Sequence, residues 1–277
     1  MPLPKVRCRS CRRGVFFILC WLSLPSLIAG ADWPANVTKD PPGKFPLPRP
    51  LRAKYNFGWS GFTAALGETR FTRPSDDRCV FEGTGRTIGL VRALWRFDVN
   101  HHAVTDAGAL RPIEMKQIET FYRKKVTTNL SFTSAGVSRS RTDGSTSPGQ
   151  NKPKQFNFPN LFDLQSAVLY LRSQPLKDRS VYRIVVYPAT APYLATLTVT
   201  GREKISVRAG SYNAIKLDVQ LNRVGKNLQL EPHKKFKHAT VWISDDADRL
   251  ILRIEAQIFV GTVFAELQSV QFDPAKH

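Results

Sequence analysis

Residues 249–260 read RLILRIEAQIFV, and this stretch decides the fold class. Every second residue from Leu250 to Val260 is apolar, and the other face carries Arg249, Arg253, Glu255 and Gln257 together with Ile251 and Phe259. This alternation is typical of a β-strand. A strand of roughly 11 residues exceeds the usual ~5–6, which favours a wide curved sheet or an open barrel.

Other segments extend the same pattern. Residues 213–222 (NAIKLDVQLN) alternate just as clearly, and residues 55–62 (YNFGWSGF) form an aromatic strand whose glycines indicate a bend. Segments 64–72 and 78–83 can form further strands. The sequence therefore predicts a mainly β protein, with a long curved antiparallel sheet or half-barrel wrapped on one helix.

That helix is expected at residues 160–172 (NLFDLQSAVLYLR). Asn160 is a good N-cap, Asp163 follows three residues later, Arg172 complements the C-terminal dipole, and Pro175 ends the helix. A shorter helix is expected at Leu90–Trp95.

The N-terminus has the pattern of an export signal. Five basic residues precede the apolar run 14–28 (GVFFILCWLSLPSLI), and Ala29-Gly30-Ala31 gives a small-x-small cleavage pattern. A retained membrane anchor is the alternative, although the run is shorter than the ~20 residues of a typical span. We expect a signal peptide at residues 1–31, cleavage near Ala31, and a periplasmic or cell-envelope location.

The rest of the chain divides into three parts. Residues 32–50 contain a proline-rich run that favours an extended tether. Residues 51–273 are expected to form a single β-rich domain. Within it, residues 134–155 are polar and basic and contain no aromatic residue, so we expect a flexible loop that is either a solvated insertion or a binding arm.

The net charge indicates which partners to expect, and the cysteine content shows whether a disulfide can form. Removal of residues 1–31 leaves about +14 of the formal +19 charge, which favours anionic lipid or an acidic envelope polymer. Export and the lack of a recognition motif argue against nucleic acid. Cys79 is then the one remaining cysteine, so no internal disulfide can form, and we expect it to be a buried apolar group.

No motif in the sequence indicates catalysis, a cofactor or a metal site. There is no G-x-S-x-G elbow, H-E-x-x-H helix or phosphate-binding loop. The acidic segment 244–248 (SDDAD) could hold calcium, but its place between two strand patterns favours a hairpin turn. We expect no catalytic residue; a hydrolase using Ser166 or Ser244 with a distant histidine is the alternative.

Several short motifs, in order, resemble a bacterial exported family known as domain of unknown function number 3108. They are residues 55–61, the helical segment 162–172, the segment 210–214 (GSYNA), and residues 241–246 (VWISDD) with Arg249, Gly261 and residues 265–267 (AEL). A proline common in the family after the arginine is replaced here by Leu250-Ile251. The resemblance implies an envelope location and a β-rich fold, similar to the half-barrel of some periplasmic lipoprotein carriers, and no established reaction.

Two groups of candidate site residues follow. A non-enzymatic module that binds a lipid-like ligand, an envelope ligand or a partner would use aromatic residues on the curved sheet: Trp59, Phe62, Tyr182 and Trp242. The polar residues of the family-like motifs are expected to be structural: Asp163, Ser166, Tyr170, Arg172, Ser244, Asp245, Asp246 and Arg249. Peripheral membrane contact is expected through the basic clusters at residues 139–141, 152–154 and 234–237.

Overall fold

The computed structural model describes residues 32–144, 152–232, 236–258 and 261–274. Trp33–His277 form one compact unit. The described strands form one sheet of sixteen. The first eight are β1 (Leu51–Trp59), β2 (Phe62–Ser75), β3 (Arg78–Thr87), β4 (Phe97–Asp106), β5 (Pro112–Phe121), β6 (Lys124–Thr133), β7 (Gly136–Asp143) and β8 (Lys154–Asn157). The others are β9 (Leu161–Phe162), β10 (Val181–Val186), β11 (Tyr193–Val207), β12 (Gly210–Val224), β13 (Leu230–Pro232), β14 (Phe236–Ser244), β15 (Ile251–Ile258) and β16 (Thr262–Phe272).

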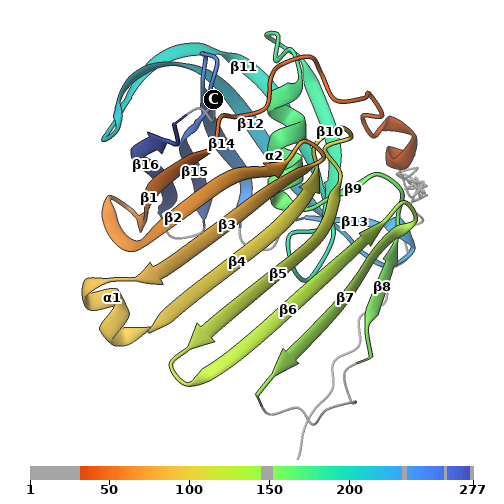
Figure 1. The fold of residues 1–277 in the computed structure, drawn as a ribbon, viewed down its shortest axis with the longest axis horizontal. Helices are drawn as coiled ribbons and strands as arrows, with labels where there is room; N and C mark the ends of the chain where they lie inside the picture. The colour runs from red at the N-terminus through yellow and green to blue at the C-terminus, as the bar shows by residue number, and fades with distance from the viewer. Residues whose placement is uncertain (1–31, 145–151, 233–235, 259–260, 275–277) are drawn as a thin grey trace, which may run out of the picture. The chain divides into compact units, whose positions relative to one another are not determined.

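The sheet is built almost entirely from neighbouring antiparallel strands. Its order is β8-β7-β6-β5-β4-β3-β2-β1-β16-β15-β14-β12-β11-β10-β9, with β13 paired to β12. Strand β16 returns to pair with β1, and only the β9–β10 pairing is parallel among the described strands. Figure 1 shows the sheet curving so that the helix α2 (Leu164–Ser173) lies inside the curve. The predicted fold class is therefore confirmed.

Helix α2 begins later than the sequence predicted. Asn160 has a left-handed backbone (φ 60°) and does not cap the helix. Asp163 is the N-cap instead: its Oδ1 accepts from the Ser166 backbone N–H at 2.7 Å, and the Ser166 hydroxyl accepts from the Asp163 N–H at 3.0 Å. This reciprocal arrangement is a capping box with serine in place of the usual glutamate or glutamine.

The Asp163 cap makes a first testable prediction. The side chain is buried, and burial raises the pKa of its carboxyl group. Asp163→Ala should lower the free energy of unfolding by about 1–2 kcal/mol through loss of the cap, whereas Asp163→Asn keeps the capping oxygen. Because the raised pKa favours the protonated form in the folded state, the parent protein should lose stability as pH rises from the ordinary carboxyl range through that pKa.

The Asn variant carries no such titration, so its stability relative to the parent should increase over the same pH window. Urea unfolding of the three proteins from acid to neutral pH measures both effects. If the Ala and Asn variants are equally destabilised at every pH, the capping role of Asp163 is wrong.

The polar segment 134–155 is only partly a loop. Residues 136–143 form β7, which pairs with β6 through a tight turn, and residues 154–157 form β8 at the edge of the sheet. Residues 145–151 lie outside the described residues. The prediction of one flexible loop was wrong for β7, because backbone pairing with β6 supplies its hydrogen bonds without an apolar pattern. The shorter predicted helix is present as α1 (Gly89–Leu94).

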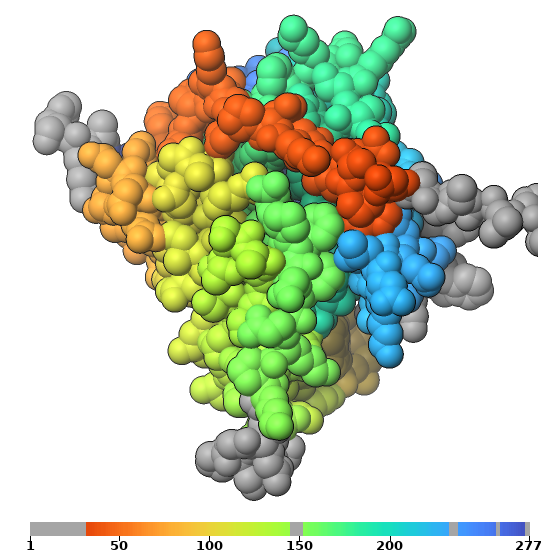
Figure 2. Space-filling model, turned by 90° about the vertical axis from the view of Figure 1, so that its right-hand side faces the viewer, coloured from red at the N-terminus to blue at the C-terminus, as the bar shows by residue number. Residues whose placement is uncertain are grey.

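The proline-rich segment packs against α2. The Gly43 N–H donates to the Ser173 hydroxyl at 2.9 Å, the Phe45 N–H donates to the Ser173 carbonyl at 3.2 Å, and the Tyr170 hydroxyl donates to the Asp40 carbonyl at 3.0 Å. Figure 2 shows this orange-red segment lying across later parts of the chain. It is extended, as expected, but it belongs to the packed unit that begins at Trp33 and does not hold a domain at a distance.

Two clusters of buried side chains stabilise the unit. The larger cluster joins α2 to strands of both halves of the sheet and includes Cys79, whose pKa burial raises to about 11. The smaller cluster contains Trp33, Met115, Leu130 and Val185, so it ties β5 and β6 to β10. The predicted export signal at residues 1–31 lies outside the described residues. Among the residues that are described, no helix is long and apolar enough to cross a membrane.

Candidate functional site

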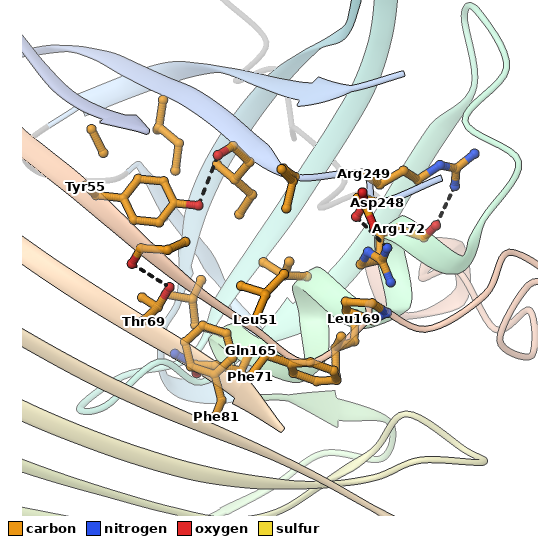
Figure 3. A pocket seen from close by; sticks show the side chains of 18 of the residues that line it. Leu51, Tyr55, Thr69, Phe71, Phe81, Gln165, Leu169, Arg172, Asp248 and Arg249 are labelled. Carbon is orange, nitrogen blue, oxygen red and sulfur yellow. Dashed lines mark hydrogen bonds between the residues drawn. The ribbon is translucent and has the colours of Figure 1, made fainter. Parts of the chain in front are cut away.

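An apolar cavity of about 260 Å³ lies between helix α2 and the strands β1, β2, β3, β15 and β16 (Figure 3). Its apolar lining consists of Pro48, Leu51, Ala53, Tyr55, Phe57, Phe71, Phe81, Leu164, Val168, Leu169, Leu250, Ile251, Ile254 and Ala265. The polar residues are Thr69, Gln165, Arg172, Asp248 and Arg249. The volume is near the lower end of the usual range of ligand pockets, about 300–1,000 Å³, and suits a slender apolar group.

Regular secondary structure brings this lining together. Alternate residues of β1 from Leu51 to Phe57 point to the same face of the sheet. On α2, Leu164 and Val168 are four residues apart, and Leu169 and Arg172 are three apart, so both pairs present side chains along one side of the helix. The cavity is thus the space left where a short helix meets a wide curved sheet.

One end of the cavity is polar. Figure 3 shows Arg172, Asp248 and Arg249 together at this end, away from Tyr55. Arg172 donates from Nη1 to the Pro46 carbonyl at 3.0 Å and from Nη2 to the Asp248 carbonyl at 2.6 Å. Arg249 donates from Nη1 to the carbonyls of Arg172 and Gln174. The two guanidinium groups therefore connect the end of α2 to the β14–β15 turn and to the proline-rich segment.

Positive charge is in excess at this polar end. Within the described residues, neither Arg172 nor Arg249 forms an ion pair with a carboxylate, whereas Asp248 pairs with Arg49 at 2.7 Å. Burial, together with the nearby Arg249, lowers the pKa of Arg172 to about 10, so the group stays charged at neutral pH. The Phe45 ring lies 3.4 Å from the Arg249 guanidinium carbon, and this cation–π contact offsets part of the cost of burying two like charges.

Most other polar groups in the lining have partners. The Tyr55 hydroxyl donates to the Ile251 carbonyl at 3.0 Å, and burial raises its pKa. Gln165 differs, because its Oε1 is buried and accepts no hydrogen bond from the residues that the structure describes. Neighbouring atoms cover this oxygen completely, so it presents no acceptor to a group inside the cavity.

The four aromatic residues predicted to bind ligand do not form one surface. Trp59 and Phe62 are exposed at the tip of the β1–β2 hairpin, 45% and 75% respectively. Tyr182 and Trp242 are buried in the larger core cluster, and the Trp242 Nε1 donates to Glu203 at 2.6 Å. None of the four lines the cavity. The residues that do line it are mostly aliphatic, and their sequence pattern is the same as that of ordinary core residues.

The polar motif residues hold the ends of α2 and the β14–β15 turn. Ser166 caps the helix with Asp163, and Tyr170 anchors the proline-rich segment. In the turn, Asp246 Oδ1 accepts from the Ser244 hydroxyl at 2.7 Å and from the Arg249 N–H at 3.1 Å. Asp245 pairs with Arg202 at 2.9 Å, while Arg172 and Arg249 also line the cavity.

The serines named for the hydrolase alternative are inaccessible. Ser166 and Ser244 are both 0% exposed, and their hydroxyls donate to Asp163 and Asp246. A substrate carbonyl cannot reach either oxygen in this arrangement. In the ranges that the structure describes, no group of His, Cys, Asp and Glu has the geometry of a metal site.

The fold and the cavity define a class of β protein in which one curved sheet partly surrounds a single helix and an apolar pocket. The chain belongs to the family described as "Protein of unknown function (DUF3108)", whose model matches residues 54–268. This confirms the resemblance seen in the sequence motifs. Among curated proteins, none matches this sequence.

Solved structures match this chain at low sequence identity. A β-barrel-like protein of domain of unknown function DUF1849 from Brucella abortus has a TM-score of 0.56 and 8% identity, over 82% of this chain and 99% of that chain. A protein with a YmcC-like fold from Bacteroides fragilis has a TM-score of 0.32 and 12% identity, over 83% and 99%. The Brucella structure supports the β-barrel-like architecture and nothing about activity.

Proposed function

We propose that this protein is an exported cell-envelope protein that binds an amphiphile without transforming it. The observation that carries the proposal is the apolar cavity between α2 and the curved sheet, lined by fourteen apolar and five polar residues. Apolar cavities of this kind bind apolar groups because the ligand loses its contact with water and gains close packing. The export pattern at residues 1–31 supports the location.

The polar end of the cavity suggests the chemistry of the head group. Arg172 and Arg249 bring two positive charges to this end, and Asp248, the one carboxylate among the described lining residues, is paired with Arg49. A carboxylate or phosphate would gain charge-assisted hydrogen bonds from guanidinium N–H groups. The ligand class is therefore a single-chain amphiphile with an anionic head.

A cavity-filling variant tests the proposal. Ala265 lines the cavity, so Ala265→Phe should occupy the space of the apolar chain and weaken dodecanoate binding by about tenfold or more. Gln268 lies on the same strand and lines a depression on the outer surface, so Gln268→Phe adds a comparable volume away from the cavity. Isothermal titration of the full chain with dodecanoate measures both affinities.

The head group is tested in the same experiment. Dodecanol and dodecyltrimethylammonium should bind more weakly than dodecanoate, because neither carries an anionic head for the guanidinium groups. Equal dodecanoate affinity of the Ala265→Phe and Gln268→Phe variants would show that the chain binds elsewhere. If the three ligands bind with equal affinity, binding does not depend on an anionic head group, and the proposal is reduced to an apolar cavity that binds an apolar chain.

A further inference from the structure

Six of the twelve exposed large apolar side chains in the described part of the chain gather at one end of the sheet. They belong to the β1–β2 hairpin, to α1 between β3 and β4, and to the turn between β5 and β6. Consecutive antiparallel hairpins place these three connections at the same end, as Figure 1 shows. The residues, here called the apolar rim, are Trp59, Phe62, Leu90, Leu94, Trp95 and Tyr122.

The exposure of the rim is unusually high for side chains of this size. Leu90 is 77% exposed, Leu94 is 72% exposed, and α1 contributes no buried residue to the core. The two leucines are four positions apart, so both project from the same side of the helix. Single exposed apolar residues are common, but a group of six at one end of a sheet indicates an interaction surface.

The rim is held in place by contacts behind it. Trp95 stacks on Phe97 with ring centroids 5.3 Å apart, and Phe97 packs on Phe121 at 4.8 Å. The Tyr122 hydroxyl donates to the Leu94 carbonyl, which fixes α1 to the neighbouring turn. The exposed side chains are thus presented by a supported framework, which reduces the entropy lost on binding.

Basic residues accompany the rim. Tyr122 is followed directly by Arg123, Lys124 and Lys125, all exposed. Along β6 to β8, a depression is lined by Lys124, Arg139, Arg141, Lys152 and Lys154 with one acidic residue, Asp143. Apolar side chains bordered by cations match a surface that is apolar inside and anionic outside, which is the chemistry of an anionic lipid bilayer.

We propose that the apolar rim docks this protein on the surface of an anionic lipid bilayer. Phe62, Leu90 and Leu94 enter the region below the head groups, while Arg123, Lys125 and the basic depression contact lipid phosphates. The proposal is independent of the cavity ligand, because no rim residue lines the cavity. All the residues assigned to the bilayer contact lie in the part of the chain that the structure describes.

A local readout tests the docking, because other parts of the full chain can also bind vesicles. Vesicles of phosphatidylcholine with brominated phosphatidylglycerol should quench the fluorescence of Trp95, and the quenched signal should fall in Trp95→Phe. Trp242→Phe is the matched control, because Trp242 is buried in the core and should not be quenched. Quenching should decrease as salt is added, since surface charges are screened.

Substitutions then separate the two parts of the surface. Leu90→Ser with Leu94→Ser should raise the lipid concentration needed for half-maximal Trp95 quenching by about tenfold or more. The control pair is Leu228→Ser with Leu230→Ser, which removes two exposed leucines from a different part of the fold. Arg123→Gln and Lys125→Gln should each raise the lipid concentration needed for half-maximal Trp95 quenching by about fivefold at low salt.

Three outcomes would overturn the proposal. Trp95 quenching that is unchanged by the Leu90 and Leu94 substitutions excludes the rim as the docking surface. Equal quenching by brominated phosphatidylcholine vesicles that lack an anionic lipid excludes the electrostatic part. A dimer in light scattering that dissociates in the same leucine variant, with no quenching in the parent, shows that a second copy of the chain covers the rim.

Discussion

Replacing Arg249 with methionine is expected to lower the free energy of unfolding by about 3 kcal/mol. The guanidinium group is the donor to two buried carbonyls at the end of α2, those of Arg172 and Gln174. Methionine keeps much of the side-chain length but leaves both acceptors without this donor, and each such loss costs about 1–3 kcal/mol. For a domain of this size, a change of that magnitude lowers Tm by roughly 6–12 °C.

Arg253 provides a matched control on the neighbouring strand. Its side chain is 36% exposed and pairs with Glu255 and Glu266 at the surface, so Arg253→Met should cost less than about 1 kcal/mol. Urea unfolding of the two variants gives the comparison. If Arg249→Met is no more destabilising than Arg253→Met, the guanidinium group does not hold the helix to the turn.

Gly43→Val is expected to lower the free energy of unfolding by about 2–3 kcal/mol. A Cβ atom at this position would lie 2.1 Å from the carbonyl oxygen of Ser173, and backbone atoms cannot yield as a flexible side chain can. The proline-rich segment must then move away from α2, with loss of the hydrogen bonds from Gly43 and Phe45 to Ser173. Overpacking alone costs about 1–3 kcal/mol.

Gly108→Val is the control for the change in unfolded-state entropy. The nearest atom to its added Cβ is Asp106 Oδ1 at 3.6 Å, an ordinary contact. This variant should be as stable as the parent or slightly more so, because the unfolded chain loses freedom. Limited proteolysis should also cut residues 41–47 faster in Gly43→Val. Equal stability and equal cleavage in both variants would show that the proline-rich segment is only a linker.

The strands that alternate apolar and polar residues could be predicted from the sequence. Residues 213–222 and 249–260 lie largely in β12 and β15, because a sheet with one buried face requires this pattern. Strand β7 (GVSRSRTD) could not be identified in the same way, since it lies near the sheet edge and its outer residues remain exposed. Which residue is the N-cap of the helix could be decided only from the structure, because Asn160 and Asp163 are both good N-caps.

The cavity could not be predicted because its lining is scattered from residue 48 to residue 265. Leu51, Phe71 and Leu169 satisfy the same apolar pattern whether they touch a neighbour or border a space. The sequence motifs did single out Arg172 and Arg249, but only the structure shows that they meet at one end of that space. Aromatic residues gave a weaker guide, since Tyr182 and Trp242 are in the core and Trp59 and Phe62 are at a hairpin tip.

Methyl NMR of leucine- and isoleucine-labelled protein during titration with dodecanoate shows whether the apolar chain of the ligand enters the cavity. Binding in the cavity predicts saturable shifts for the methyl groups of Leu51, Leu169 and Ile254, which line it. The methyl groups of Leu130 and Leu217, buried elsewhere in the core, should stay unchanged. Shifts confined to the exposed Leu90 and Leu94, or no saturable shift at any cavity methyl group, would contradict binding in the cavity.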